Sequence, residues 1–280
     1  MTIFGKVEKI WRYPVKGVQG EEIGEVFAGF GGVMKNIIRV TALIWIVGFT
    51  NTTVAGETEG EIFGGKVSGW VSLGTDRVFR GESETQTSDV PSLQGSFTWT
   101  HDSGVYLGYW AGTNKFDVEP AIYAESGPYI GITNDIGDTG FNYNVFWFQY
   151  FYHKDDDSPP NHYSELWMNL SKQFGQVHLN LEVAPTTSDW FNIDGLRGLH
   201  VGLTPTIKLS QGFSLSGTVG RQMFNNDTFP EWSYWEAGVF YVYQDYKFDL
   251  RYHDTNFKSG LDKVSELFED KLVFTISKNF

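Results

Sequence analysis

The last ten residues, 271–280, read KLVFTISKNF, and apolar side chains alternate with polar ones up to an aromatic carboxyl terminus. Period two is the pattern of a β-strand with one apolar face. An aromatic end is typical of the last strand of a transmembrane barrel. The predicted lipid-facing row is Leu272, Phe274, Ile276 and Phe280, and the predicted inner row is Lys271, Val273, Thr275, Ser277 and Asn279. Soluble sandwiches show the same alternation, so the fold depends on whether the rest of the chain repeats it.

About twelve segments have strand character. Most span 9–14 residues, which matches the ~9–11 residues of a tilted strand that crosses a bilayer. Strands in soluble sheets usually have only ~5–6 residues. The segments are expected at 65–80, 93–101, 104–112, 119–132, 141–153, 162–174, 176–184, 196–209, 212–222, 232–244, 246–254 and 270–280.

The connectors alternate between short and long. Tight turns are expected at 102–103, 175, 210–211 and 245, with a somewhat longer turn at 133–140. Long polar loops are expected at 81–92, 113–118, 154–161, 185–195, 223–231 and 255–269. Short turns on one rim and long loops on the other are how outer-membrane barrels are built. The sequence therefore predicts an all-β fold, a closed antiparallel transmembrane β-barrel of about 12 strands whose last strand pairs with the first.

The composition agrees with this prediction. The chain has no cysteine, which excludes disulfides and thiolate chemistry, and aromatic residues make up 17% of it. No apolar run reaches the ~20 residues that a membrane-spanning helix needs. Because every backbone polar group must be paired inside a bilayer, such a chain can cross a membrane only as a closed sheet.

The amino-terminal region carries an export signal. A basic segment begins at Met34, an apolar core runs from Val40 to Phe49, and small residues follow up to Ala55, which is the pattern of a secretory signal peptide. Residues 5–26, beginning GKVEKIWRYPVKG, resemble the start of MOSC-type proteins, a molybdenum-cofactor-associated family expected to use a cysteine. The predicted organisation is a spurious or fused leader at 1–33, a signal peptide at 34–55 and the barrel at 56–280.

The charge balance is strongly acidic. The net charge is −13, and removing residues 1–55 would take six of 21 basic and four of 34 acidic side chains, leaving 15 and 30. This excess excludes nucleic acid as an expected partner, because binding it requires a basic face. The acidic side chains gather in connectors, as at Glu82, Glu84 and Asp89 and in 154–157, which are interpreted as solvated loops.

Several strands separate an apolar face from a polar one. In segment 246–254, Lys247, Asp249, Arg251 and His253 alternate with apolar residues. A charged side chain facing lipid near the midplane costs ~2–4 kcal/mol, so the polar faces are expected to line the lumen. The predicted lumen-lining residues are Lys66, Asp76, Arg80, His178, Glu182, His200, Lys208, Lys247, Asp249, Arg251 and His253.

The segment Trp70–Lys115 carries a family resemblance. Its most specific part is Asp76 with Phe79, Arg80 and Gly81, and further matching positions are Ser72, Thr75, Val78, Gln94, Gly95, His101, Ser103, Gly104, Tyr106, Gly108 and Trp110. With 212–220, 235–254 and 273–280, this segment resembles the Gcw_chp family of proteobacterial conserved hypothetical proteins, which usually has tyrosine where this chain has Arg77. The resemblance implies an outer-membrane barrel of a Gram-negative bacterium and leaves its activity open.

Two aromatic clusters lie at 141–152 and 232–243. We interpret them as rings of the two membrane-interface girdles and as packing between strands. If Phe146, Phe148 and Tyr150 point inward instead, they would form a lumenal patch that stacks on a sugar or narrows a pore.

Three functional hypotheses follow. Twelve strands exceed the eight whose interior is filled by side chains, so the first is a small channel, or porin, for hydrophilic solutes. The second is a non-conducting structural or surface-binding barrel, because mixed lumenal charges can pair and plug the lumen. The third is a lipid-active enzyme. The chain has no Gly-x-Ser-x-Gly elbow and no metal-ligand spacing, so we expect no catalytic residue, no cofactor and no metal.

The expected partners follow from the barrel. They are outer-membrane lipid and, during biogenesis, the barrel assembly machinery and periplasmic chaperones, for which Phe280 would be the assembly signal. The sequence does not indicate an oligomeric state.

Overall fold

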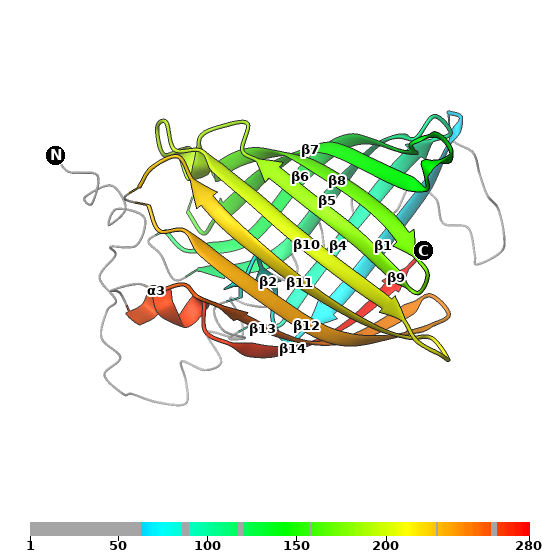
Figure 1. Cartoon of the computed structure of the whole chain (residues 1–280). Coiled ribbons are helices and arrows are strands. Elements are labelled where there is room, and N and C mark those ends of the chain that lie inside the picture. The colour runs from blue at the N-terminus through cyan, green and yellow to red at the C-terminus, as the bar shows by residue number, and fades with distance from the viewer. Residues whose placement is uncertain (1–62, 86–89, 117–119, 157, 228, 259–261) are drawn as a thin grey trace, which may run out of the picture.

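Twelve long antiparallel strands close into a barrel in the computed structural model, which describes residues 63–280 except 86–89, 117–119, 157, 228 and 259–261 (Figure 1). The predicted fold is confirmed. The wall strands are β1 (Gly65–Gly74), β4 (Ser92–His101), β5 (Val105–Phe116), β6 (Ile122–Asp135), β7 (Phe141–Lys154), β8 (Asn161–Phe174), β9 (Val177–Pro185), β10 (Gly198–Lys208), β11 (Phe213–Phe224), β12 (Trp232–Tyr243), β13 (Tyr246–Thr255) and β14 (Lys271–Asn279).

The barrel closes between its first and last strands, as the sequence predicts. β1 pairs with β14 in a register that sets Leu73 against Ile276. Beyond this ladder, Gly69 and Phe280 exchange two backbone hydrogen bonds of 2.8 and 2.9 Å. A Cβ at Gly69 would lie 2.6 Å from the Phe280 ring, so glycine is needed where the terminal aromatic residue packs on the wall.

The two rims differ as the connector lengths predict. Tight turns and the short 3-10 turn η1 (Gly137–Thr139) join strands at one rim. Longer connections, which include η2 (Trp190–Asn192) and the short helix α3 (Asp262–Leu267), lie at the other rim. The carboxyl terminus lies at the short-turn rim, at the right of Figure 1, and α3 lies at the opposite end. In the described part of the chain, no helix is long and apolar enough to cross a bilayer.

The outer surface of the wall is apolar. Leu107, Ile130, Val219 and Leu272 are 50, 53, 59 and 62% exposed. In β14 the neighbouring Val273 is only 6% exposed, because successive side chains of a strand point to opposite faces. An apolar exterior around a polar interior is the pattern of a transmembrane barrel.

The first strand is shorter than predicted. β1 ends at Gly74, and residues 75–85 turn into the barrel, where β2 (Val78–Phe79) and β3 (Glu82–Ser83) form a two-stranded hairpin. The prediction of one strand over 65–80 is therefore wrong at its end. The interpretation of 81–92 as a solvated acidic loop is wrong for Glu84, whose side chain is 3% exposed.

Other predictions fall on residues that the structure does not describe. The leader at 1–33, the signal peptide at 34–55, Asp89 and Asp157 lie outside the described residues. The remaining strands begin and end within a few residues of their predicted limits.

Candidate functional site

The inward segment 75–85, called the lumenal hairpin here, turns at two residues. Arg80 and Gly81 connect β2 to β3 with φ angles of +52° and +86°. Two consecutive positive φ values are the requirement of a type I′ turn, which strongly favours glycine at its second position. A Cβ at Gly81 would collide with the side chain of Thr255 and lie 2.8 Å from Cβ of Tyr234. The tip of the hairpin therefore packs directly on the wall.

Substituting Gly81 with alanine should loosen the lumenal hairpin. The variant combines a side chain at positive φ, which costs ~1 kcal/mol, with a collision against rigid wall residues. We expect a lower temperature for loss of the heat-modifiable folded band in gel electrophoresis. Gly195→Ala is the matched control, because Gly195 also has a positive φ (+73°) but has no atom within 4 Å of the added Cβ. Equal shifts in the two variants would contradict this packing role.

The Arg80 side chain fastens the hairpin tip to the wall. Its guanidinium donates hydrogen bonds of 2.7 and 2.9 Å to the two carboxylate oxygens of Glu165 on β8, and one of 3.0 Å to Oε1 of Gln222 on β11. The Arg80 carbonyl accepts a 2.8 Å hydrogen bond from Nε1 of Trp232 on β12. The Arg80 and Glu165 side chains are 3 and 0% exposed. A paired, bidentate geometry of this kind is what allows two charges to be buried.

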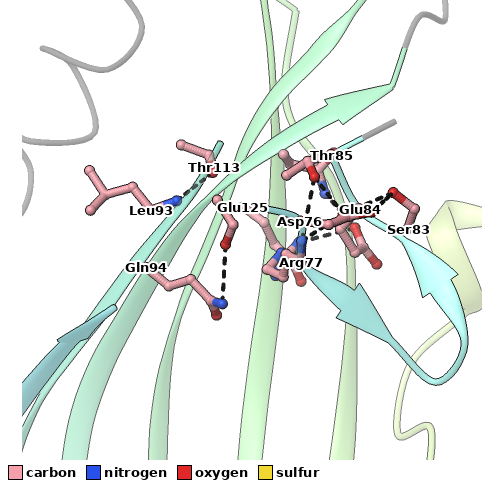
Figure 2. A network of polar contacts seen from close by, with 11 residues as sticks. Asp76, Arg77, Ser83, Glu84, Thr85, Leu93, Gln94, Thr113 and Glu125 are labelled. Carbon is pink, nitrogen blue, oxygen red and sulfur yellow. Dashed lines mark hydrogen bonds and ion pairs between the residues drawn. The ribbon is translucent and has the colours of Figure 1, made fainter. Parts of the chain in front are cut away.

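The Asp76 carboxylate organises the base of the hairpin (Figure 2). Its Oδ1 accepts hydrogen bonds from the backbone N–H of Arg77 at 2.6 Å and from the hydroxyl of Thr85 at 2.5 Å. The hydroxyl of Ser83 lies 3.0 Å from both carboxylate oxygens. One side chain therefore joins the two arms of the hairpin.

Arg77 links the hairpin to β6. Its Nη2 donates to Glu84 at 3.0 Å and pairs with Glu125 (Figure 2). Its guanidinium also lies over the ring of Trp110 at 5.0 Å. Burial raises the pKa of the Glu84 carboxyl well above its ordinary value, and the attraction of Arg77 offsets this only in part. Burial also raises the pKa of Glu82 to about 8. The carboxyl groups of Glu82 and Glu84 therefore hold their protons more tightly than isolated carboxyl groups would.

A cavity of about 500 Å³ lies between the hairpin and the wall. Lys247, Asp249, Arg251 and His253, four of the predicted lumen-lining residues, line it from β13, and Asp76 lines it from the hairpin. The inner row of β14 contributes Val273, Thr275 and Ser277. Arg80 was predicted to line the lumen as part of a wall strand, but it is buried in the hairpin instead.

The other predicted residues lie elsewhere on the wall. Oε1 of Glu182 on β9 lies 2.9 Å from Nδ1 of His200 on β10, and Nε2 of His200 lies 3.0 Å from the hydroxyl of Tyr234. His178 lies just after the short turn between β8 and β9, and Lys208 lies just before the short turn between β10 and β11. Lys66 lies near the start of β1. None of these five residues lines the cavity.

Sequence reasoning missed several residues of this region. Glu125 and Glu165 bind the hairpin, and Glu236 holds Arg251 at 3.1 Å, yet none was predicted as a lumenal residue. The signal that could have found them is an acidic side chain in the middle of a strand, which has no place in lipid. Arg77 was likewise not predicted as a lumenal residue, and it is part of the hairpin network.

The aromatic cluster of β7 also differs from the favoured interpretation. Phe146, Phe148 and Tyr150 line the cavity, so the girdle interpretation is wrong for these three rings. Trp147 is 36% exposed on the outer face and fits a girdle position. Because both faces of β7 are aromatic, alternation could not show which row points inward.

Serine–histidine contacts occur among the described residues, and one of them, with 2.8 Å between Ser103 Oγ and His101 Nδ1, lies in the exposed turn after β4. No group of three or more His, Asp or Glu side chains in the described part of the chain could hold a metal ion. Ser126 Oγ lies 2.7 Å from His153 Nε2 and 2.8 Å from the Tyr109 hydroxyl. However, Ser126 is only 1% exposed, so its oxygen is shielded by this hydrogen-bonded chain.

The sequence model of a family described as "Bacterial protein of unknown function (Gcw_chp)" matches residues 59–280. The chain belongs to the Gcw_chp family. The match covers the whole barrel, and the residues that most specifically resemble Gcw_chp, Asp76 and Phe79–Gly81, are those of the lumenal hairpin. The comparisons do not support the likeness of residues 5–26 to MOSC-type proteins.

Solved structures with the same fold as this Gcw_chp protein include two small porins. The structure titled "KdgM porin" has a TM-score of 0.51 at 6% identity, and "NanC porin structure in rhombohedral crystal form" has 0.50 at 8%. Each comparison covers 76% of this chain and 98% of the other. No curated protein sequence matches the chain significantly. At identities this low, the structural likeness shows the outer-membrane barrel fold alone. It says nothing about what the lumen carries.

Proposed function

We propose that this Gcw_chp protein is an outer-membrane channel for small hydrophilic solutes, with the lumenal hairpin as its constriction. The observation that carries this proposal is the cavity of about 500 Å³ beside the hairpin, lined on one side by charged residues of β12 and β13. An interior space with ionisable walls favours water and polar solutes over lipid. Two small porins share the fold, which agrees with the proposal.

The proposal includes the route to the membrane. Residues 34–55 act as the signal peptide, and Phe280 is the assembly signal read by the barrel assembly machinery after delivery by periplasmic chaperones. The Phe280 side chain is 60% exposed on the outer face of the wall and packs against Phe97 with 5.5 Å between ring centroids. It is therefore accessible where another protein could bind it before insertion.

Conductance measurements test the channel proposal. Protein isolated from the outer-membrane fraction, with its amino terminus at residue 56 or 57, is expected to form discrete, ion-conducting channels in planar bilayers. A heat-denatured sample of the same preparation is the control for contaminating porins, because it should lose the channels together with the heat-modifiable band. Correctly folded protein that never conducts would contradict the proposal.

The alternative is a non-conducting barrel, and one observation favours it. Arg80 is bonded to Glu165 and Gln222, and Arg77 to Glu125, so the hairpin is fastened at three wall strands. A hairpin held this firmly is a static barrier. The same conductance measurement distinguishes the two functions, because a barrel closed by its hairpin conducts only after the hairpin is released.

No catalytic activity is part of the proposal. The shielded position of Ser126 argues only against that serine as a nucleophile, since a nucleophile must reach its substrate. The lack of any three-residue metal cluster among the described residues leaves no metal assigned either.

A further inference from the structure

The cavity has two chemically different walls. On one side, rings of β5, β7 and β8 form an aromatic surface that includes Trp110, Phe146 and Trp167, with the paired side chains of Arg77 and Glu125 beside it. On the other side, β12, β13 and β14 present charged and hydroxyl side chains. A volume of about 500 Å³ falls within the ~300–1,000 Å³ typical of small-molecule sites. The cavity is therefore a site with an apolar face and a hydrogen-bonding face.

The charged wall is balanced by its own pairs. Arg251 lies 3.1 Å from both Glu236 and Asp249, and Lys247 lies 2.9 Å from Asp249. His253 is 3.1 Å from the second oxygen of Glu236. Arg77, which also lines the cavity, is paired with Glu84 and Glu125 in the same way. Each permanent cation of the lining thus faces a carboxylate. A charged ligand would have to compete with these pairs, whereas an uncharged ligand can use their remaining donors and acceptors.

The aromatic wall selects for a flat apolar surface on the ligand. Phe146 and Trp167 are stacked at 5.4 Å with 16° between their planes. Trp110 is partly buried and has the Arg77 guanidinium over one face of its ring at 5.0 Å. Aromatic faces carry partial negative charge and attract the weakly positive C–H groups of a saturated ring. An ion or a small alcohol gains little from such a surface. A ring with C–H groups on its faces and hydroxyls around its edge gains from both walls.

We propose that the cavity is a binding site for an uncharged pyranose sugar. Its C–H face packs on the aromatic wall, and its hydroxyls bond to the paired groups of β12 and β13 and to Thr275 of β14. This inference rests on the proposed channel, whose lumen contains the site, and it names the class of solute that the channel recognises.

The test measures sugar binding in two ways, with glucose and maltose as the probes. In planar bilayers, either sugar is expected to interrupt the ion current, and in detergent solution calorimetry is expected to detect binding. Trp110→Leu should weaken binding roughly tenfold, equivalent to ~1.4 kcal/mol. Thr275→Val, which removes one hydroxyl at nearly constant volume, should weaken it several-fold. The matched control is Trp235→Leu, because Trp235 is 42% exposed on the outer face.

The outcomes separate this inference from the channel proposal. Conduction without any response to sugar overturns the sugar site and leaves the channel standing. Calorimetric binding that Trp110→Leu weakens supports the site even if no current is seen, and in that case the channel proposal fails alone. Tighter binding of glucuronate than of glucose would overturn the assignment to uncharged sugars, and equal losses in Trp110→Leu and Trp235→Leu would overturn its location.

Discussion

Arg80→Ala is expected to free the lumenal hairpin and raise single-channel conductance. The substitution leaves the Glu165 carboxylate buried without its cation, and breaking a buried ion pair in this way costs ~3–5 kcal/mol. It also removes the hydrogen bond to Gln222. A change of this size shifts the balance between the seated and released hairpin by roughly 100-fold or more. Planar-bilayer recordings would show larger or more variable current steps than those of the wild type.

Two further variants make the Arg80 result specific. Arg221→Ala removes an ion pair with Glu231 whose partners are 58 and 36% exposed, and exposed pairs contribute only ~0–1 kcal/mol, so its conductance should match the wild type. Arg80→Met combined with Glu165→Leu replaces both charges by apolar groups. This double variant should largely restore the packing of the lumenal hairpin against the wall, and with it the wild-type conductance. Wild-type conductance in Arg80→Ala itself would show that the hairpin is not the constriction.

Replacing Lys247 and Arg251 together with glutamate is expected to shift ion preference strongly towards cations. Both side chains line the cavity, and the double substitution makes its charge more negative by four. At ~4 Å, a unit charge changes the energy of a permeating ion by ~1 kcal/mol in water and by more in a narrow lumen. The cation-to-anion permeability ratio, read from the reversal potential in a salt gradient, should rise several-fold.

The control for this experiment places the same charges outside the lumen. Arg221→Glu with Lys278→Glu changes two exposed residues by the same total charge and should leave the reversal potential almost unchanged. Because Arg251 also neutralises Asp249 and Glu236, the double lumenal variant has a risk of misfolding. In that case Lys247→Glu alone replaces the double variant, and the reversal potential should shift by about half as much. An unchanged preference in folded Lys247→Glu would mean that ions do not pass along β13.

The barrel itself was predictable because its signals are local. In β13 and β14, alternation of apolar and polar residues is a property of neighbouring side chains, and it identifies the lipid-facing row without knowledge of the partner strand. Loop lengths predicted the rims for a similar reason. Lys247, Asp249, Arg251 and His253 line the cavity because this alternation is regular along the whole strand.

The hairpin was not predictable in this way. Segment 75–80 has three charged residues where 65–74 has one, but charge alone does not distinguish a strand that continues along the wall from a hairpin that turns inward. What holds it is distant in the sequence, since the partners of Arg77 and Arg80 are 48, 85 and 142 residues away. The aromatic row of β7 poses a related problem. Both faces of this strand are aromatic, so the alternation does not show which face points into the lumen.

The sequence by itself determined the number of strands, their outward rows and the closure of the last strand on the first, since each follows from period-two alternation and turn length. Only the tertiary structure decided that residues 75–85 enter the lumen and that Phe146, Phe148 and Tyr150 face them. The physical reason is that burying Arg77 and Arg80 requires Glu125, Glu165 and Gln222 at one level of the barrel. These three residues come together only when the barrel has closed.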